Sequence, residues 1–423
     1  MASALVRRND YEAITRYPEF NFERNTGMKK LLIFILSVAM LLTFAACGNG
    51  QEEETEMTTE DKHNNEETTV GGSSDETTAK EEDAGDIAVI YPEENATVIL
   101  ANEDVYGWWD TFHMKKTDST PFYQHADIYY PVPVSLEWEE VEGADYYRVY
   151  ISMNEDMSEA ESYLVNSTTV ELDTLFTGKT YYWQIDAAIA DSTVRSSVHS
   201  FKTARSPRTI KVEGVSNTRD AGGYDALDGR RMKQGMIYRG GKLEEITENG
   251  IMTFHDIIGI RTDLDLRTTG EGGAGVKSPL GDDVLYVNIN GRYYIGNMGI
   301  GSEEGKETIA EEMRVFVDPA SFPVYIHCSL GRDRTGTLVM LLQGLAGVSK
   351  SDIMMDYELS IFSVTGTLDN ASIDALRSNI SATYDYISKS YQGENFAEKV
   401  EKYLLSCGMT ADEIAAIRDN LLE

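Results

Sequence analysis

Alternation of apolar and polar residues is the dominant pattern between residues 87 and 204. Val134–Trp138 and Tyr147–Ile151 alternate in this way, and three further segments follow: Thr169–Leu172, Tyr181–Ile185 and His199–Thr203. A period of two residues is typical of a β-strand with one face buried. Short strands at this spacing, separated by turn residues, predict an all-β sandwich over residues 87–204. The pattern leaves Trp108 and Trp109 unexplained.

A different pattern begins near residue 205, where apolar strand-like runs alternate with helical periodicity. Phe322–Ile326 is a short, β-rich apolar run, and Thr337–Gln343 reads as a buried helix. This order predicts an α/β domain over residues 205–423, with a mainly parallel sheet flanked by helices. Thr410 and Glu413 have the spacing of a capping box, which predicts the start of the last helix.

The N-terminal part has the pattern of an export signal. Met28-Lys29-Lys30 precedes an apolar run, Leu31–Cys47, that ends in small residues. An uncleaved signal anchor is the alternative, although this run is short for about 30 Å of hydrocarbon. Residues 1–27 are polar and lack periodicity, and we interpret them as an unstructured upstream extension. Residues 48–86 are rich in Glu, Thr, Gly and Ser, which predicts an acidic disordered linker.

Charge and cysteine content reduce the range of possible partners and cofactors. The chain of 423 residues has 71 acidic and 37 basic residues, a net charge of −34. Such acidity argues against a nucleic-acid partner, which requires a basic surface. The three cysteines, Cys47, Cys328 and Cys407, indicate no disulfide framework. Neither a C-x-x-C pair nor a histidine cluster is present, so we predict no metal and no cofactor.

The candidate chemistry lies between the predicted strand and helix around residue 330, where a cysteine is followed six positions later by an arginine. A loop ending at a helix N-terminus can hold a tetrahedral dianion with its backbone N–H groups. Arg334 can bind two oxygens of that dianion, and the same positive field lowers the pKa of the Cys328 thiol. The sequence therefore predicts Cys328 as a nucleophile. It predicts a phosphate-binding loop made of Ser329, Leu330, Gly331, Arg332, Asp333 and Arg334.

The stretch His327–Gly336, H-C-x-x-G-x-x-R-T-G, resembles the signature of cysteine-dependent phosphatases. Three earlier motifs, N-x-R-D-x-G-G-Y from Asn217, Y-R-G-x-x-L from Tyr238 and D-L-R from Asp265, precede it in order. Together they resemble the bacterial secreted tyrosine phosphatases over residues 205–423. The resemblance implies hydrolysis of phosphotyrosine, phosphoserine/threonine or phosphoinositides through a phosphocysteine.

Roles for the neighbouring residues are less uniquely defined. The resemblance favours Asp333 as the general acid, with Asp265 second, because ligands bind where parallel strands end. Thr335 can bond the sulfur or be a helix hydroxyl, and His327 can fix the loop or be purely structural. Five residues are candidates for substrate binding: Arg219, Asp220, Arg239, Lys242 and Arg267. A basic residue of this set is more often a surface or salt-bridge residue, and Asp220 can equally bond the glycine turn that follows it. Asp220 is also a third candidate for the acid.

Two further resemblances concern the first half of the chain. The end of the apolar run resembles a bacterial lipoprotein box, which implies that Cys47 is lipidated. It places the protein on the extracytoplasmic face of a bacterial cell membrane, or shed from it. Trp138, the turn 143–145 and the stretch 175–183 resemble a fibronectin type III domain. Its aromatic residues are expected in the sandwich core, with a protein or carbohydrate platform as the alternative.

These observations lead to one main function and two alternatives. The main expectation is an exported, membrane-tethered phosphatase acting on a phosphorylated protein or a phosphoinositide. A phytase-like phosphatase of inositol polyphosphates would share the loop but need a wider basic pocket. An adhesion or binding protein with a silent phosphatase fold is the third reading. The intact set of Cys328, Asp333 and Arg334 argues against that third reading.

Overall fold

The computed structural model describes residues 87–115, 129–291, 299–363 and 370–423. The predicted upstream extension (1–27), the export signal or anchor (28–47) with Cys47, and the acidic linker (48–86) lie outside the described residues. Within the described ranges, no helix has the length and apolar character needed to cross a membrane.

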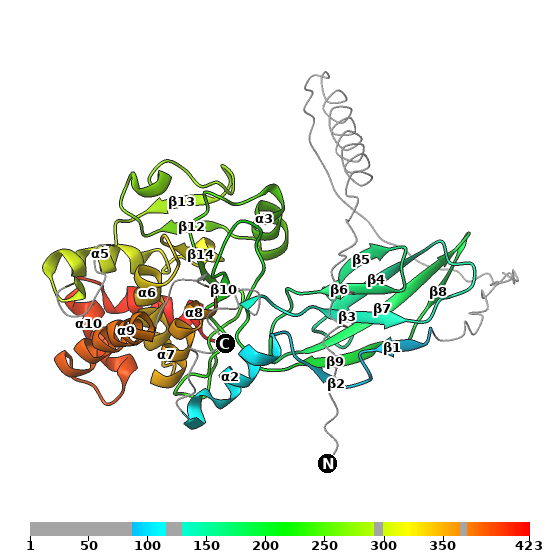
Figure 1. Cartoon of the computed structure of the whole chain (residues 1–423), viewed down its shortest axis with the longest axis horizontal. Coiled ribbons are helices and arrows are strands. Elements are labelled where there is room, and N and C mark those ends of the chain that lie inside the picture. The colour runs from blue at the N-terminus through cyan, green and yellow to red at the C-terminus, as the bar shows by residue number, and fades with distance from the viewer. Residues whose placement is uncertain (1–86, 116–128, 292–298, 364–369) are drawn as a thin grey trace, which may run out of the picture. The chain divides into compact units, whose positions relative to one another are not determined.

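Two β-sheets form the first part of the described chain (Figure 1). One has the order β1-β3-β6, and the other has the order β2-β9-β7-β4-β5, with β8 paired to β7. The strands are β1 Val89–Tyr91, β2 Ala96–Val98, β3 Val134–Trp138, β4 Tyr146–Ser152, β5 Glu161–Val165, β6 Thr169–Leu172, β7 Thr180–Ile189, β8 Ser192–Arg195 and β9 His199–Thr203. All five predicted strands are confirmed. Trp138, Tyr147 and Trp183 are buried in one apolar cluster, so these three side chains are core and do not form a surface platform.

Helix α2, Glu103–Lys115, interrupts this region and was not predicted. Its Trp108 is buried, and the Trp108 ring lies 4.9 Å from the ring of Phe362, centroid to centroid. Tyr129 is buried in the same apolar cluster. The all-β prediction for 87–204 is therefore wrong at α2, which is a helix. The buried side chains of Trp108 and Tyr129 pack into the core of the α/β region instead of the sandwich core.

The second part contains a five-stranded sheet of order β10-β11-β14-β12-β13. Its strands are β10 Arg219–Asp220, β11 Ile237–Gly240, β12 Thr262–Asp265, β13 Leu285–Asn288 and β14 Val324–His327. Strands β11, β14, β12 and β13 pair in parallel, as predicted, and β10 is antiparallel to β11. His327 is level with Gly240 on one neighbouring strand and Asp265 on the other. The carboxyl ends of three adjacent strands thus meet at one edge of the sheet.

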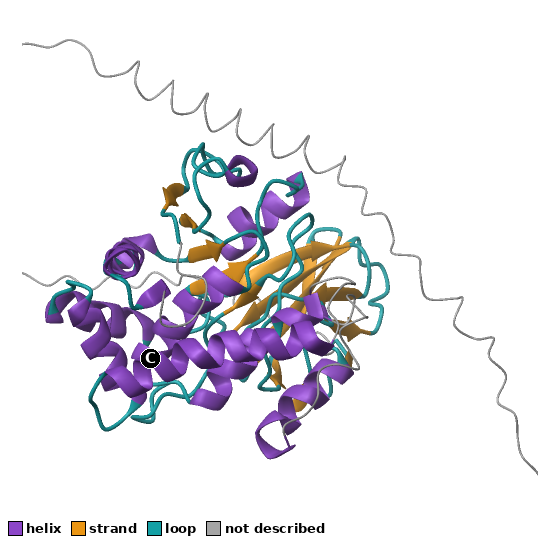
Figure 2. Cartoon of the chain, turned by 60° about the vertical axis from the view of Figure 1, so that its left-hand side comes forward, coloured by secondary structure: helices purple, strands orange, loops and turns teal. Residues whose placement is uncertain are grey.

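Both faces of this sheet are covered. Val324 and Ile326 of β14 pack into one apolar cluster, and Tyr325 between them packs into another. Figure 1 shows labelled helices beside the sheet, and Figure 2 shows helices in purple packed beside strands in orange. The helices of this part of the chain are α3 Glu248–Met252, η3 Thr253–Ile258, η4 Glu271–Gly273, α5 Glu303–Arg314, η5 Pro319–Ser321, α6 Asp333–Ala346, α7 Lys350–Glu358, α8 Ser360–Ser363, α9 Asn370–Ser390, α10 Phe396–Ser406 and α11 Ala411–Leu421. The capping box that begins α11 is confirmed.

Candidate functional site

The loop between β14 and α6 begins with Cys328 and ends where α6 starts at Asp333. Gly331 turns this loop with a positive φ of +64°. A Cβ atom at Gly331 would lie 2.0 Å from the carbonyl oxygen of Gly240. Only glycine therefore permits both the left-handed conformation and the close approach of β11 to the loop.

The carbonyl groups of the loop are bound from outside the loop. The side-chain amide of Asn217 donates to the carbonyl of Leu330 at 2.9 Å, and the guanidinium of Arg239 donates to that of Gly331 at 2.9 Å. The backbone N–H of Lys242 donates to the carbonyl of Ser329 at 3.3 Å. The N–H groups of Leu330 and Thr335 act on the sulfur of Cys328. With the N-terminus of α6 they form a cradle of the kind that binds anions.

Cys328 is buried at the base of this cradle. Burial alone raises the pKa of its thiol, but hydrogen bonds from Thr335, the charge of Arg334 and the N–H of Leu330 outweigh it and lower the pKa. Thr335 is itself fully buried in the first turn of α6. The arrangement therefore favours the thiolate, the form of cysteine that acts as a nucleophile.

A fully buried network of ion pairs lies behind the loop. Asp356 of α7 accepts hydrogen bonds from Arg219 at 3.0 Å and from Arg239 at 2.5 Å. All three side chains are almost completely buried. The predicted substrate-binding role of Arg219 and Arg239 is therefore wrong, because neither guanidinium reaches the surface. Instead, Arg239 connects Asp356 to the carbonyls of the loop.

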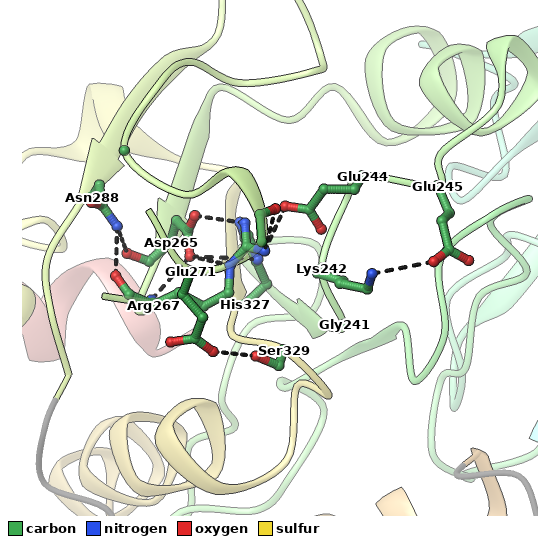
Figure 3. A network of polar contacts seen from close by, with 12 residues as sticks. Gly241, Lys242, Glu244, Glu245, Asp265, Arg267, Glu271, Asn288, His327 and Ser329 are labelled. Atoms are coloured by element: carbon green, nitrogen blue, oxygen red, sulfur yellow. Dashed lines mark hydrogen bonds and ion pairs between the residues drawn. The ribbon is translucent and has the colours of Figure 1, made fainter. Parts of the chain in front are cut away.

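Asp265 is in a second buried network, at the end of β12 (Figure 3). Both of its carboxylate oxygens accept from the guanidinium of Arg267, at 2.9 and 2.8 Å. Burial raises the pKa of Asp265, but the bonds from Arg267 and the charge of His327 outweigh it and lower the pKa. A carboxylate that is fully buried and held ionised cannot donate a proton to a substrate, so the prediction of Asp265 as runner-up acid is wrong. The guanidinium of Arg267 is bound to Asp265 and to Glu244, so in this structure it is paired within the protein.

His327 is buried below the cradle. Its Nε2 lies 2.9 Å from a carboxylate oxygen of Asp263. Burial alone lowers the pKa of His327, but Asp263 outweighs this and raises it. His327 thus joins β14 to β12 by an ion pair, which agrees with the loop-fixing and structural readings.

Asp220 has a structural position. Its carboxylate accepts from the N–H groups of Gly222 at 2.8 Å and Gly235 at 2.6 Å. It also pairs with Arg208 at 2.9 Å and is buried. This arrangement fixes the glycine turn and excludes Asp220 as an acid or a substrate contact.

Asp333, at the end of the loop, has a carboxyl group that reaches solvent. Its side chain is 26% exposed, and one oxygen accepts from the hydroxyl of Tyr357 at 2.7 Å. The other oxygen lies 3.2 Å from the guanidinium of Arg332. Of the three predicted acids, Asp333 alone combines exposure with a place in the loop.

Arg334, whose guanidinium lies 3.3 Å from the Ser329 hydroxyl, is bound to a residue that the sequence analysis missed. Its guanidinium donates to both carboxylate oxygens of Glu271, at 3.0 and 2.8 Å. The hydroxyl of Ser329 also donates to Glu271, at 2.6 Å (Figure 3). The only sequence signal for Glu271 is an isolated acid within a glycine-rich segment just after the D-L-R motif.

A cavity of about 390 Å³ adjoins the loop. Leu330 connects the two, because its N–H acts on the Cys328 sulfur while its side chain lines the cavity and is 43% exposed. Lys242, a predicted substrate-binding residue, also lines the cavity and pairs with Glu245 at 3.2 Å. The other lining residues are Tyr130, Lys211, Val212, Glu213, Gly214, Val215, Ser216 and Ser329. The cavity borders the loop at Ser329 and Leu330.

Comparisons with known proteins agree with this geometry. The sequence profile of the tyrosine phosphatase family matches residues 210–423, just over half of the chain. A relative from Cupriavidus necator named "Putative tyrosine-protein phosphatase" is 25% identical over 175 residues. That match covers 35% of this chain and 61% of the relative, so the chain spans less than two thirds of its length.

Three solved structures show weaker likeness. The core catalytic domain of the PP-IP phosphatase SIW14 from S. cerevisiae is 15% identical, with 40% of this chain and 88% of that chain covered and a TM-score of 0.25. A second structure of the Siw14 catalytic core is 16% identical, with coverages of 46% and 96% and a TM-score of 0.26. An Fn3-like protein from Clostridium thermocellum is 21% identical, with coverages of 18% and 79% and a TM-score of 0.16. Scores at this level carry no argument about function.

Proposed function

Because the chain belongs to the tyrosine phosphatase family, we propose that it hydrolyses phosphomonoesters through a phosphocysteine intermediate. The observation that carries the proposal is the position of Cys328, which is buried in the loop beside the N–H groups of Leu330 and Thr335 and in the field of Arg334. A nucleophile and an anion-binding site then share one loop. Phosphotyrosine is the first substrate to test, followed by phosphoserine, phosphothreonine and phosphoinositides.

The proposed reaction has two displacements at phosphorus. The thiolate of Cys328 attacks, an S–P bond forms, and the P–O bond to the leaving group breaks. Asp333 donates its proton to the leaving oxygen. A water molecule then attacks phosphorus while Asp333 takes its proton, the S–P bond breaks, and its electron pair returns to sulfur. Inorganic phosphate leaves, and Cys328 is again a thiolate.

Replacement of Cys328 tests the proposal directly. Cys328→Ser should abolish turnover of p-nitrophenyl phosphate and of a phosphotyrosine peptide, because a serine hydroxyl is not ionised near neutral pH. The variant should still bind phosphate, since the cradle remains. Turnover by Cys328→Ser, or inhibition of the unaltered chain by EDTA, would contradict cysteine chemistry. A panel that adds phosphoinositides and phytate separates the main function from the phytase-like one.

Alkylation provides a second test, with an internal control. Burial raises the pKa of the Cys407 thiol to about 11, whereas the pKa of Cys328 is lowered. Iodoacetate at neutral pH should therefore label Cys328 and inactivate the protein while Cys407 stays unmodified. Peptide mass spectrometry gives the extent of labelling at each cysteine. Equal labelling of both would remove the support that the thiol pKa gives.

We further propose that the protein is exported and held on the extracytoplasmic face of a bacterial membrane by a lipid on Cys47. The support is the pattern of residues 28–49. Mass spectrometry of the mature N-terminus tests it, because an unmodified residue ahead of Cys47 would exclude the lipoprotein. We also propose that the two sheets before residue 205 form a fibronectin type III domain that binds a protein or carbohydrate ligand through residues other than the buried Trp138, Tyr147 and Trp183. A glycan array with Cys328→Ser protein tests the carbohydrate ligand.

A further inference from the structure

Glu271 lies in η4, outside the phosphate-binding loop, yet its carboxylate is bound by two residues of that loop, Arg334 and Ser329. Figure 3 shows the contact with Ser329. Arg334 donates to both oxygens of Glu271, at 3.0 and 2.8 Å. The hydroxyl of Ser329 donates to one of the same oxygens at 2.6 Å. These contacts place a negative charge at the mouth of the cradle.

The fork that Arg334 makes with Glu271 is the contact that it would make with a phosphate. A carboxylate and a phosphate each present two oxygens to the parallel N–H groups of a guanidinium. The same two N–H groups of Arg334 cannot bind the carboxylate and a phosphate at the same time. Hydrogen bonds from Arg334 and Ser329 lower the pKa of Glu271 to about 2, so the carboxylate is charged at neutral pH. Glu271 and a phosphate must therefore compete for Arg334.

The surroundings of Glu271 allow it to leave the fork. Its side chain is 36% exposed, whereas that of Arg334 is 4% exposed. The backbone around it is held by the bond from the N–H of Ala274 to the carbonyl of Glu271 at 3.1 Å. Arg334 is also bound to the carbonyl of Leu266 at 3.2 Å. A rotation of the Glu271 side chain into solvent breaks its bonds from Arg334, from Ser329 and from the N–H of Thr268 at 3.3 Å, while Arg334 keeps its bond to Leu266.

We propose that Glu271 is an internal competitor for phosphate. In the free protein its carboxylate binds the guanidinium of Arg334, and the phosphate of the substrate displaces it. After hydrolysis it takes the fork again, which favours release of inorganic phosphate. This inference rests on the proposed function, and it adds a residue that sets both substrate affinity and product release.

Competition and simple positioning of Arg334 predict opposite kinetics. If Glu271 competes, its neutral isostere should let phosphate bind more tightly, so KM for substrate and Ki for phosphate should fall together. If Glu271 only orients Arg334, its removal should leave a misplaced arginine, so phosphate should bind more weakly and kcat should fall. The direction of the change in phosphate affinity decides between them.

The experiment compares Cys328→Ser with Cys328→Ser/Glu271→Gln by calorimetric titration with inorganic phosphate. The Kd should fall about three- to tenfold in the double variant, because a charged hydrogen-bond acceptor is replaced by a weaker neutral one. In the chain that retains Cys328, Glu271→Gln should lower KM for p-nitrophenyl phosphate and Ki for phosphate by a similar factor. Thermal melting checks that the variants are folded.

Glu401→Gln is the matched control. Glu401 pairs with Arg418 at 2.9 Å and is 32% exposed, but it lies on α10 and does not contact the loop. This change should leave phosphate affinity unaltered. Unchanged or weaker phosphate binding by Glu271→Gln would overturn the inference. If the chain that retains Cys328 hydrolyses no phosphomonoester, the proposed function fails instead, and the phosphate titration still tests Glu271.

Discussion

Two arginine–carboxylate sites border the loop between β14 and α6, one behind it and one where Arg334 meets Glu271. Behind the loop, Asp356 joins Arg219 and Arg239, and none of these side chains is more than 1% exposed. At the mouth, Arg334 is buried but its partner Glu271 is about one-third exposed. The pairing chemistry is the same at both sites, and the difference is access to water.

Burial determines what each pair can do. Removing a carboxylate from two buried guanidinium groups would leave charges unpaired in a region of low dielectric, so the site behind the loop is permanent. At the mouth, water or a phosphate can replace the carboxylate, so that pair can open. One arginine site thus shapes the loop through its carbonyls, and the other holds the arginine that we propose binds phosphate.

The largest expected effect at the mouth concerns Asp333. Asp333→Asn should lower the rate by about 10²–10⁴-fold, as loss of a general acid does. The deficit should be smaller for p-nitrophenyl phosphate, whose leaving group departs without a proton, than for phosphoserine peptide. Measurement of kcat/KM on both substrates tests this. An equal deficit on both would show that Asp333 does not donate the proton.

The largest effect behind the loop concerns Asp356. Asp356→Ala should destabilise the protein by about 3–5 kcal/mol, because it leaves Arg219 and Arg239 buried without their carboxylate. Urea unfolding measures this. Asp385, which bridges Lys350 and Lys389 at the surface, provides the control, and Asp385→Ala should cost at most about 1 kcal/mol. Similar losses of stability in the two variants would contradict the distinction between buried and solvent-accessible ion pairs.

The stabilisation that Asp356 provides with Arg219 and Arg239 should depend on pH in a predictable way. Burial raises the pKa of Asp356, but Arg219 and Arg239 outweigh it and hold the pKa below the unfolded value of about 3.9. Its stabilisation is therefore present at neutral pH and is lost as the pH falls through the folded pKa. Between pH 7 and pH 5, the difference in stability between Asp356→Ala and the unaltered chain should stay constant.

The loop itself could be predicted because its determinants are local. Cys328 and Arg334 lie on one strand–loop–helix unit, and the apolar runs on either side define that unit. The partners of its arginines could not be predicted in this way. Glu271 is 63 residues from Arg334, and Asp356 is 137 residues from Arg219. No periodicity links residues so far apart, and only the assembled sheet brings them together.

Two errors have the same physical origin. Asp265 was correctly placed at the end of a strand, but the sequence does not show that the guanidinium two residues later binds both of its oxygens. Trp108 and Tyr129 precede the family domain, yet they are buried in its core, where they complete apolar packing with residues such as Phe362. In each case the tertiary neighbours decide the role of the residue.

The smallest predicted effect concerns Tyr130, which lines the cavity beside Leu330 and lies ahead of the family match. Its neighbour Tyr129 is buried and bonded to the carbonyl of Thr218 at 3.2 Å, which fixes this segment beside the cavity.

If the cavity accepts the ring of an aryl phosphate, Tyr130→Ala should raise KM about two- to tenfold, because aromatic pairs contribute about 0.5–1.5 kcal/mol. The loss should appear with phosphotyrosine peptide and be absent with phosphoserine peptide, which has no ring, and Tyr130→Phe should retain the unaltered KM. Tyr146, which is 40% exposed on β4, provides the control. An equal rise in KM on both peptides would mean that Tyr130 only supports the loop, and the mouth would then select for phosphate alone.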